Sequence, residues 1–243
     1  MRAVLATYLR ELRAYFVSPL AYVVLFFFLI VNGIVFGNLA SILSDPQAPA
    51  GPPMTYFFGS TTLMLLILGV VLTMRLVSEE LRSGSIEVLM TAPVTEGQVI
   101  AGKYLAALTF FAFLWLPTLV YAALVDYYGE IDWGPVAAGY LGILLIGALF
   151  LAVGIFASAT TSSQLAAAMI TAALLFLLFL LGWFTDIFAG ETAKQVFTYL
   201  SLGDHIDEFS RGIVDTRRLV FYLSATLFFL FLASRALEDK KWR

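Results

Sequence analysis

Long stretches without a charged side chain dominate the pattern of this sequence. Asp, Glu, Lys and Arg are absent from residues 14–44, 46–74, 104–125, 133–185 and 219–234. Because an ion at the bilayer centre costs about 2.5–3.5 kcal/mol on insertion scales, such gaps are expected where helices cross lipid. Strands of a membrane barrel would alternate apolar and polar residues, and the run LLFLLFLL at 174–181 does not. The pattern therefore predicts an all-α integral membrane protein.

Proline, glycine and polar residues divide these stretches into six transmembrane helices. The stretch 133–185 must hold two of them, because one helix of that length would be about 80 Å long, and SATTSSQ at 158–164 is the natural break. Pro117 predicts a kink in the third span. The expected spans cover about 20–43, 56–74, 103–125, 134–157, 165–184 and 219–235. Together they form one domain, 1–243, with too few other residues for a separate catalytic domain.

The basic residues predict the orientation. With six spans and an inner N-terminus, ten of the fourteen Lys and Arg residues lie on the inner side, as the positive-inside rule requires of a cytoplasmic face. We therefore expect both termini in the cytoplasm. A cleaved signal peptide is the alternative interpretation of the first span, but the apolar run is longer than the usual length of about 7–15 residues.

Composition narrows the function classes. Hydrophobic residues make up 61% of the 243 residues and charged residues 13%, which is about half of the charged fraction typical of soluble domains. The chain has no cysteine, which excludes disulfides, thiolate metal sites and a cysteine nucleophile. The net charge of −3 adds little, so the positions of the charges carry the information.

The first 18 residues have the pattern of an amphipathic helix on the inner membrane surface. Apolar residues at helical spacing face one side, and basic residues face the other. Ser18-Pro19 is expected to end this helix and turn the chain into the membrane. A plain cytoplasmic extension of the first span is the alternative. The apolar set is Val4, Leu5, Tyr8, Leu12 and Tyr15, and the basic set is Arg2, Arg10 and Arg13.

The longest cytoplasmic connection, residues 75–103, carries mixed charges and a short apolar pattern. Ser85 is placed to cap a short helix that Pro93 ends. An apolar face on a helix of one or two turns outside the membrane needs a surface to bury it, and a partner protein is the obvious candidate. The apolar face is Ile86, Leu89 and Met90; the charges are Glu79, Glu80 and Glu87 against Arg75 and Arg82.

The same connection ends in a sequence that looks like a phosphate-binding loop but lacks its chemistry. Residues 97–103 fit G-x-x-x-x-G-K, yet Tyr104 stands where Ser or Thr would hold Mg²⁺. No buried strand is expected before this segment, and an apolar span follows it. We therefore expect no nucleotide site and no catalytic residue in this chain.

The outer connection, residues 186–218, predicts two short helices at the outer membrane boundary. His205 stands beside several carboxylates, a grouping that could hold a metal ion. The simpler interpretation, which we favour, is a solvated acidic helix start without a metal. The apolar positions are Val196, Tyr199, Leu200, Ile206, Phe209 and Ile213; the carboxylates are Asp204, Asp207 and Glu208.

Two sets of motifs resemble a known family. The cytoplasmic connection carries Glu80-x-x-x-Gly84-Ser85-x-Glu87-x-Leu89-x-x-x-Pro93, followed by Gly102-Lys103 at the start of the third span. This pattern resembles the ABC-2 type exporter permeases. The segments HIDEFSRGIVDTR at 205–217 and LEDKKWR at 237–243 are similar to the gliding-motility-type branch of these permeases.

The resemblance implies a half-transporter in the cytoplasmic (inner) membrane of a prokaryote. Two copies, or this chain and a homologue, would form the membrane part. Two separate ATPase subunits would dock below it and use ATP and Mg²⁺, while this chain would bind no cofactor and no nucleic acid. An auxiliary subunit is also compatible with the family. The expected docking elements are the N-terminal helix, residues 1–15, and a coupling helix at about 85–92, and the outer connection becomes a re-entrant helix pair.

Three sets of candidate site residues follow from the resemblance. The docking and coupling set is Glu79, Glu80, Arg82, Gly84, Ser85, Ile86, Glu87, Leu89 and Pro93. The interface-helix set is Arg2, Tyr8, Arg10 and Arg13. The outer set is His205, Phe209, Arg211, Gly212 and Asp215.

The leading functional hypothesis is ATP-driven export, with a hydrophobic or lipid-like cargo suggested by spans that hold almost no ions. A secondary transporter driven by an ion gradient usually needs an intramembrane carboxylate or a repeated half with unwound helices, and neither is visible. An intramembrane enzyme would need a nucleophile–base pair or a metal cluster at membrane depth. A non-transporting membrane anchor for a partner complex stays open as an alternative.

Overall fold

The computed structural model describes residues 2–44, 52–84, 94–129, 131–181 and 199–241. Within these ranges the chain is helical and has no strand, so the predicted all-α class is confirmed. The helices in chain order are α1 (Arg2–Val17), α2 (Pro19–Leu43), α3 (Thr55–Ser60), α4 (Thr62–Thr73), α5 (Ser78–Ser83), α7 (Glu96–Trp115), η1 (Leu116–Thr118), α8 (Leu119–Tyr128), α9 (Trp133–Thr160), α10 (Gln164–Leu180), α12 (Leu202–Ser210) and α13 (Thr216–Lys241).

Five of the expected membrane spans are long and apolar enough to cross a bilayer. They are Pro19–Leu43, Thr62–Ser83, Glu96–Tyr128, Trp133–Thr160 and Thr216–Lys240. The second differs from the predicted 56–74, because it begins at α4 and runs through α5, which the sequence predicts as part of the cytoplasmic connection. The expected fifth span contains α10, which has 17 residues and is about 26 Å long, slightly less than the hydrocarbon thickness. Because α10 contacts α5 at one end of the bundle and α12 at the other, its course favours a sixth crossing. The sixth crossing stays a prediction.

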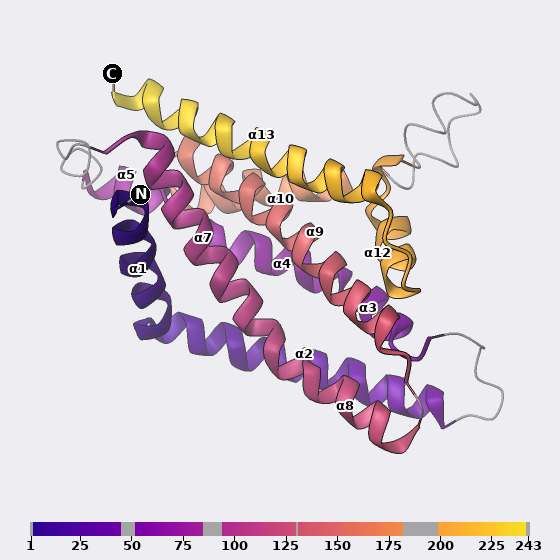
Figure 1. The fold of residues 1–243 in the computed structure, drawn as a ribbon. Coiled ribbons are helices and arrows are strands. Elements are labelled where there is room, and N and C mark those ends of the chain that lie inside the picture. Colours follow the sequence, from indigo (N-terminus) through magenta and orange to yellow (C-terminus); the bar gives the residue numbers. More distant parts are fainter. Residues whose placement is uncertain (1, 45–51, 85–93, 130, 182–198, 242–243) are drawn as a thin grey trace.

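The helices form a bundle whose two ends differ in content (Figure 1). The start of α1, the last turns of α13 and the short helix α5 lie at one end, and α3 and α12 lie at the opposite end. The long helix α9 is the most buried of the candidate spans and packs against α4, α10, α12 and α13.

The helix breaks occur where local chemistry requires them. Pro117 cannot donate a backbone hydrogen bond, and the chain tightens there into η1 before it continues as α8, which confirms the predicted kink. The break between α9 and α10 spans three residues after Thr160, and the side chain of Ser163 caps α10 by accepting a hydrogen bond from the amide of Ala166. The expected second span is interrupted at Thr61, which separates α3 from α4.

The N-terminal helix is a separate element and not an extension of the first span. α1 ends at Val17, Ser18 is extended, and Pro19 occupies the first position of α2, where its missing amide hydrogen costs nothing. The predicted turn at Ser18-Pro19 is therefore confirmed, and the alternative of a plain extension is wrong. That α1 lies on a membrane surface stays a prediction.

Glycines on α9 allow its neighbours to approach closely. A methyl group added at Gly154 would lie 2.7 Å from the Cβ of Thr73 on α4, and one added at Gly147 would lie 2.3 Å from the ring of Phe111 on α7. Real Cβ atoms are essentially never found at such distances, so an added side chain at either glycine would force Thr73 or Phe111 to move.

We expect Gly154→Ala to lower the free energy of unfolding by about 1–3 kcal/mol, because the new methyl group must push α4 away from α9. Thermal unfolding of the purified protein in detergent measures the change. The matched control is Gly37→Ala in α2, where no atom lies within 4 Å of the added methyl group. An equal loss in both variants would contradict the packing argument.

Candidate functional site

The first element of the site is the close contact between α1 and α7, which Gly102 makes possible. A Cβ at Gly102 would lie 2.8 Å from the Cβ of Thr7 and 3.0 Å from the carbonyl oxygen of Val4. At the far end of α1, Tyr15 is buried; its ring stacks on Phe110 of α7 with centroids 4.9 Å apart. The α1 face that carries Tyr8, Leu12 and Tyr15 is therefore held by α7 in this chain.

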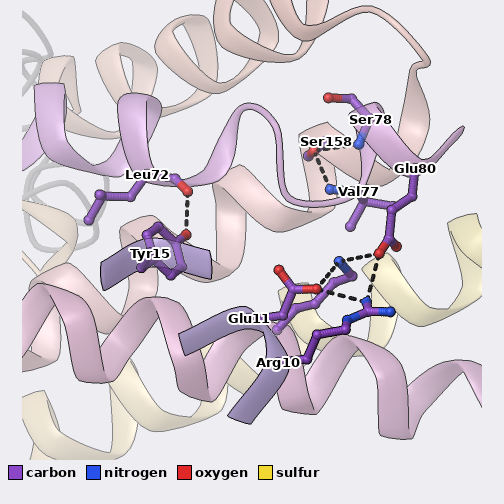
Figure 2. Close-up of polar contacts among 9 residues, drawn as sticks. Arg10, Glu11, Tyr15, Leu72, Val77, Ser78, Glu80 and Ser158 are labelled. Atoms are coloured by element: carbon purple, nitrogen blue, oxygen red, sulfur yellow. Dashed lines mark hydrogen bonds and ion pairs between the residues drawn. The ribbon is translucent and has the colours of Figure 1, made fainter. Parts of the chain in front are cut away.

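Lys103, the residue after Gly102, is a buried cation that joins three elements. Its side chain is 1% exposed, and its Nζ lies 3.0 Å from Oε1 of Glu11 on α1 and 3.0 Å from Oε1 of Glu80 on α5. Arg10 approaches the same two oxygens from the solvent side, with Nη2 2.8 Å from each. Figure 2 shows the side chains of Arg10, Glu11 and Glu80 converging on one another. We call Arg10, Glu11, Glu80 and Lys103 the inner charge cluster.

The inner charge cluster is electrically balanced, with two cations and two carboxylates. A buried ammonium needs such partners, because the desolvation cost of an isolated ion is several kcal/mol. Burial alone would raise the pKa of the Glu11 carboxyl, but the charges of Lys103 and Arg10 outweigh burial and hold this pKa below its ordinary value. The carboxylate is therefore ionised at neutral pH.

A second set of contacts anchors α5 to α9. The turn between α4 and α5 presents the backbone amides of Val77 and Ser78, which donate to Oγ of Ser158 at 3.1 and 3.0 Å. The Ser158 hydroxyl donates in turn to the carbonyl of Met74 at 3.3 Å. The hydroxyl of Tyr15 adds a link from α1 to the carbonyl of Leu72 at 2.7 Å (Figure 2). The position of α5 is thus set by α1, α7 and α9 together.

The structure brings only some of the predicted docking residues together. Glu80 and Arg10 belong to the inner charge cluster, whereas Glu79, Arg82 and Arg13 are exposed outside it. Gly84 ends α5 with a φ of +70°, a backbone conformation in which a side chain would be strained. Tyr8 contacts the Thr109 hydroxyl at 3.3 Å, and Arg2 begins α1. Five predicted residues lie outside the described residues: Ser85, Ile86, Glu87, Leu89 and Pro93.

Sequence reasoning missed Glu11, Lys103 and Ser158 as site residues. A signal for Glu11 was present, because it falls at helical spacing on the inward face of α1, between Tyr8 and Tyr15. Lys103 was noted in the Gly102-Lys103 motif and in a false phosphate-loop pattern, but its burial depends on tertiary packing. The sequence predicts a helix break that includes Ser158, but Ser158 lies within α9, and its contacts depend on tertiary packing.

At the opposite end of the bundle, His205 is fully buried, so the predicted solvated helix start is wrong at this residue. Its Nε2 donates to the carbonyl of Tyr199 at 3.1 Å, because a carbonyl can only accept, and its Nδ1 therefore accepts from the Tyr222 hydroxyl at 2.6 Å. Burial between α12 and α13, followed by the charge of Arg218, lowers the pKa of His205 to about 4. The imidazole is neutral at pH 7.

An ion pair reinforces the same end. Arg218 on α13 donates from Nε and Nη2 to both carboxylate oxygens of Glu208 on α12 at 3.1 Å, and from Nη1 to the carbonyl of Tyr199 at 3.0 Å. Among the described residues no group of three or more His, Asp or Glu side chains is arranged to hold a metal ion. Both ring nitrogens of His205 are engaged by protein atoms instead.

The other predicted outer residues shape the turn between α12 and α13. Phe209 is buried against α9 at Gly142, where an added Cβ would lie 2.7 Å from the ring. Gly212 has a φ of +85° just after α12, and Asp215 accepts from the amide of Arg217 at 2.8 Å at the start of α13. Arg211 is exposed and pairs with Asp207 at 3.0 Å. Phe209, Gly212 and Asp215 therefore help to position α12 and α13.

Comparison with known protein families identifies a match over most of the chain. A family model described as ABC-2 family transporter protein matches residues 39–241. The match covers α5, α7, α9 and α13 but begins after α1. No curated protein matches the chain.

Replacing Lys103 tests whether the cluster stabilises the fold. We expect Lys103→Met to lower the free energy of unfolding by about 3 kcal/mol, near the lower end for a broken buried pair, because Arg10 still contacts both carboxylates. Arg10→Gln should cost less than about 1 kcal/mol, because Arg10 is 51% exposed. Denaturant or thermal unfolding compares the two. Equal losses in the free energy of unfolding would show that Lys103 contributes no more to stability than Arg10 does.

The buried imidazole predicts a dependence of stability on pH. His205 binds a proton in the unfolded chain near its ordinary pKa of 6.5, but in the folded protein only near 4. The free energy of unfolding should therefore be insensitive to this group above pH 6.5 and fall by about 3 kcal/mol as the pH falls from 6.5 to 4. The measurement is unfolding at a series of pH values, compared with His205→Gln, which lacks this part of the slope. Identical slopes would contradict the assignment.

Proposed function

The chain belongs to the ABC-2 family of transporter proteins, and on that premise we propose that it is the membrane-spanning permease subunit of an ATP-binding-cassette exporter. It is a multi-pass membrane protein and not itself a nucleotide hydrolase. A separate ATPase subunit, using ATP and Mg²⁺, supplies the energy. In this proposal the chain works with a second copy or a homologue in the inner membrane, with both termini in the cytoplasm. The resemblance of residues 205–217 and 237–243 to the gliding-motility-type permeases is the reason to propose that branch.

The observation that carries the proposal is the salt bridge from buried Lys103 to carboxylates on both α1 and α5. The ATPase subunit docks at this end of the bundle, against α1, α5 and the connection that follows α5. A displacement of α5 then acts on two spans at once. It acts on α7 through Glu80 and Lys103, and on α9 through the hydrogen bonds to Ser158.

The energy required of such a link is modest. ATP binding need only bias an equilibrium between inward-facing and outward-facing arrangements by a few kcal/mol. One charge-assisted hydrogen bond contributes about 1.5–3 kcal/mol, so the contacts of Lys103 are of the right size to matter. The spans are apolar, which suits a hydrophobic or lipid-like cargo.

The test uses ATP hydrolysis as a readout, because it does not require the cargo to be known. The chain is co-expressed with an ABC ATPase subunit from the same organism, purified and reconstituted in vesicles. We expect the ATPase to co-purify, and we expect Glu80→Gln to preserve its binding but to reduce its stimulation by the permease about tenfold, because one bond of this kind is lost.

The control variant is Glu238→Gln, which makes the same change at an exposed carboxylate near this end of the bundle, outside the inner charge cluster. It should leave stimulation unchanged. If no ABC ATPase subunit binds the chain, the permease proposal is wrong. Binding without transport in vesicles would identify a membrane anchor instead, and full stimulation in Glu80→Gln would refute coupling through Lys103.

A further inference from the structure

A polar cavity of about 430 Å³ lies beside the inner charge cluster. Its lining comes from α1, from Ser18 at the start of α2, from the turn after α4, from α5 and from Lys103 on α7. The residues that matter here are Ser18, Arg75, Glu79 and Glu80. Because the lining includes charged groups of both signs, the cavity is not a gap that an apolar side chain would fill.

The depth of the cavity follows from the helices that meet there. Ser18 directly precedes α2, and Arg75 lies two residues after the end of α4. Both helices are charge-free throughout. The cavity therefore lies where apolar helices leave the hydrocarbon layer, which is the level of lipid headgroups. This argument depends only on the chain crossing a membrane and not on the docking of an ATPase.

The cavity is lined in part by charged groups that form no ion pair within the inner charge cluster. Arg75 donates from Nη2 to the Ser18 hydroxyl at 3.4 Å, and neither Arg75 nor Glu79 forms an ion pair with any described residue. Oε2 of Glu80 is buried and has no hydrogen-bond partner in the part of the chain that the structure describes. The cavity lining therefore offers one guanidinium and two carboxylate groups with free binding capacity.

We propose that this cavity binds the headgroup of a zwitterionic phospholipid that carries a primary ammonium group, such as phosphatidylethanolamine. The phosphate lies against Arg75 and Ser18, because a guanidinium pairs with phosphate oxygens through two parallel hydrogen bonds. The ammonium lies against Glu79 and Oε2 of Glu80 and supplies the N–H donors that a buried carboxylate oxygen requires. The acyl chains lie along the exposed apolar faces of α2 and α4.

The proposal makes a selective prediction about lipids. A quaternary ammonium has no N–H to donate, and phosphatidylglycerol has no cation at all. The purified full-length chain is equilibrated with vesicles that contain equal parts of phosphatidylethanolamine, phosphatidylcholine and phosphatidylglycerol, and retained lipid is counted by native mass spectrometry. We expect phosphatidylethanolamine to be retained at least about fivefold over either of the others, the effect of one lost charge-assisted bond at a partly exposed site. Equal retention of the three lipids overturns the proposal.

Variants locate the site. Arg75→Gln and Glu79→Gln should each reduce the preference about fivefold or more, and Arg75→Lys should restore part of it. The controls are Arg235→Gln and Glu238→Gln, an exposed pair that does not line the cavity. Unchanged preference in the two cavity variants, or equal loss in the controls, overturns the assignment. If Arg75→Gln does not fold, Ser18→Ala tests the phosphate contact in its place, and it should also reduce the preference for phosphatidylethanolamine. The lipid selectivity of the unmodified chain tests the proposal independently of any variant.

A soluble headgroup distinguishes a lipid from a free solute. Glycerophosphoethanolamine carries the same phosphate and ammonium without acyl chains. It should not displace the bound lipid when present at equal concentration, because the chains hold the headgroup at the membrane surface. Displacement at equal concentration would show that the cavity takes a soluble zwitterion, and the lipid assignment would then be wrong.

Discussion

A buried ammonium ion must be neutralised, and this requirement determines how the N-terminal helix and the cytoplasmic connection lie against the bundle. Lys103 is enclosed by protein, and among the described residues its charge is balanced by Glu11 from α1 and Glu80 from α5. If either helix moved away alone, a charge would be left without a partner in a poorly solvated place. The three elements are therefore expected to move as one unit.

Ion pairs and hydrogen bonds hold the helices together at the two ends of the bundle, whereas close packing of side chains holds them together in the middle. At the inner end, α5 is tied by an ionic link to α1 and α7 and by neutral hydrogen bonds to Ser158 of α9. At the opposite end, α12 is tied to α13 by the Glu208–Arg218 pair and by neutral His205. Between the two ends, rings and other side chains of neighbouring helices pack directly against glycines of α9. We therefore expect a displacement of α5 to be transmitted to the middle of the bundle by contacts between packed side chains and not by further charges.

The sequence allowed the helices to be predicted better than the site. Charge-free stretches and Pro117 depend on local effects, the desolvation of ions and a missing amide hydrogen. Five helices that are long and apolar enough to cross a bilayer overlap the expected spans, and the helix is interrupted at Pro117. The Lys103–Glu11 contact joins residues 92 positions apart, and only the packing of α1 on α7 brings them together. His205 was misjudged because its acidic neighbours suggested water, whereas Tyr222, 17 positions later, provides a buried partner.

The most direct test of the account asks whether Lys103 holds α1 and α5 in one arrangement. The chain has no cysteine, so spin labels can be attached at Arg13→Cys on α1 and Arg82→Cys on α5, both exposed, without other changes. Pulsed electron paramagnetic resonance in lipid vesicles then gives the distribution of distances between the two labels. We expect one narrow distribution when Lys103 is present and a broad or displaced one when Lys103→Met is added. The same narrow distribution in both proteins would contradict the account.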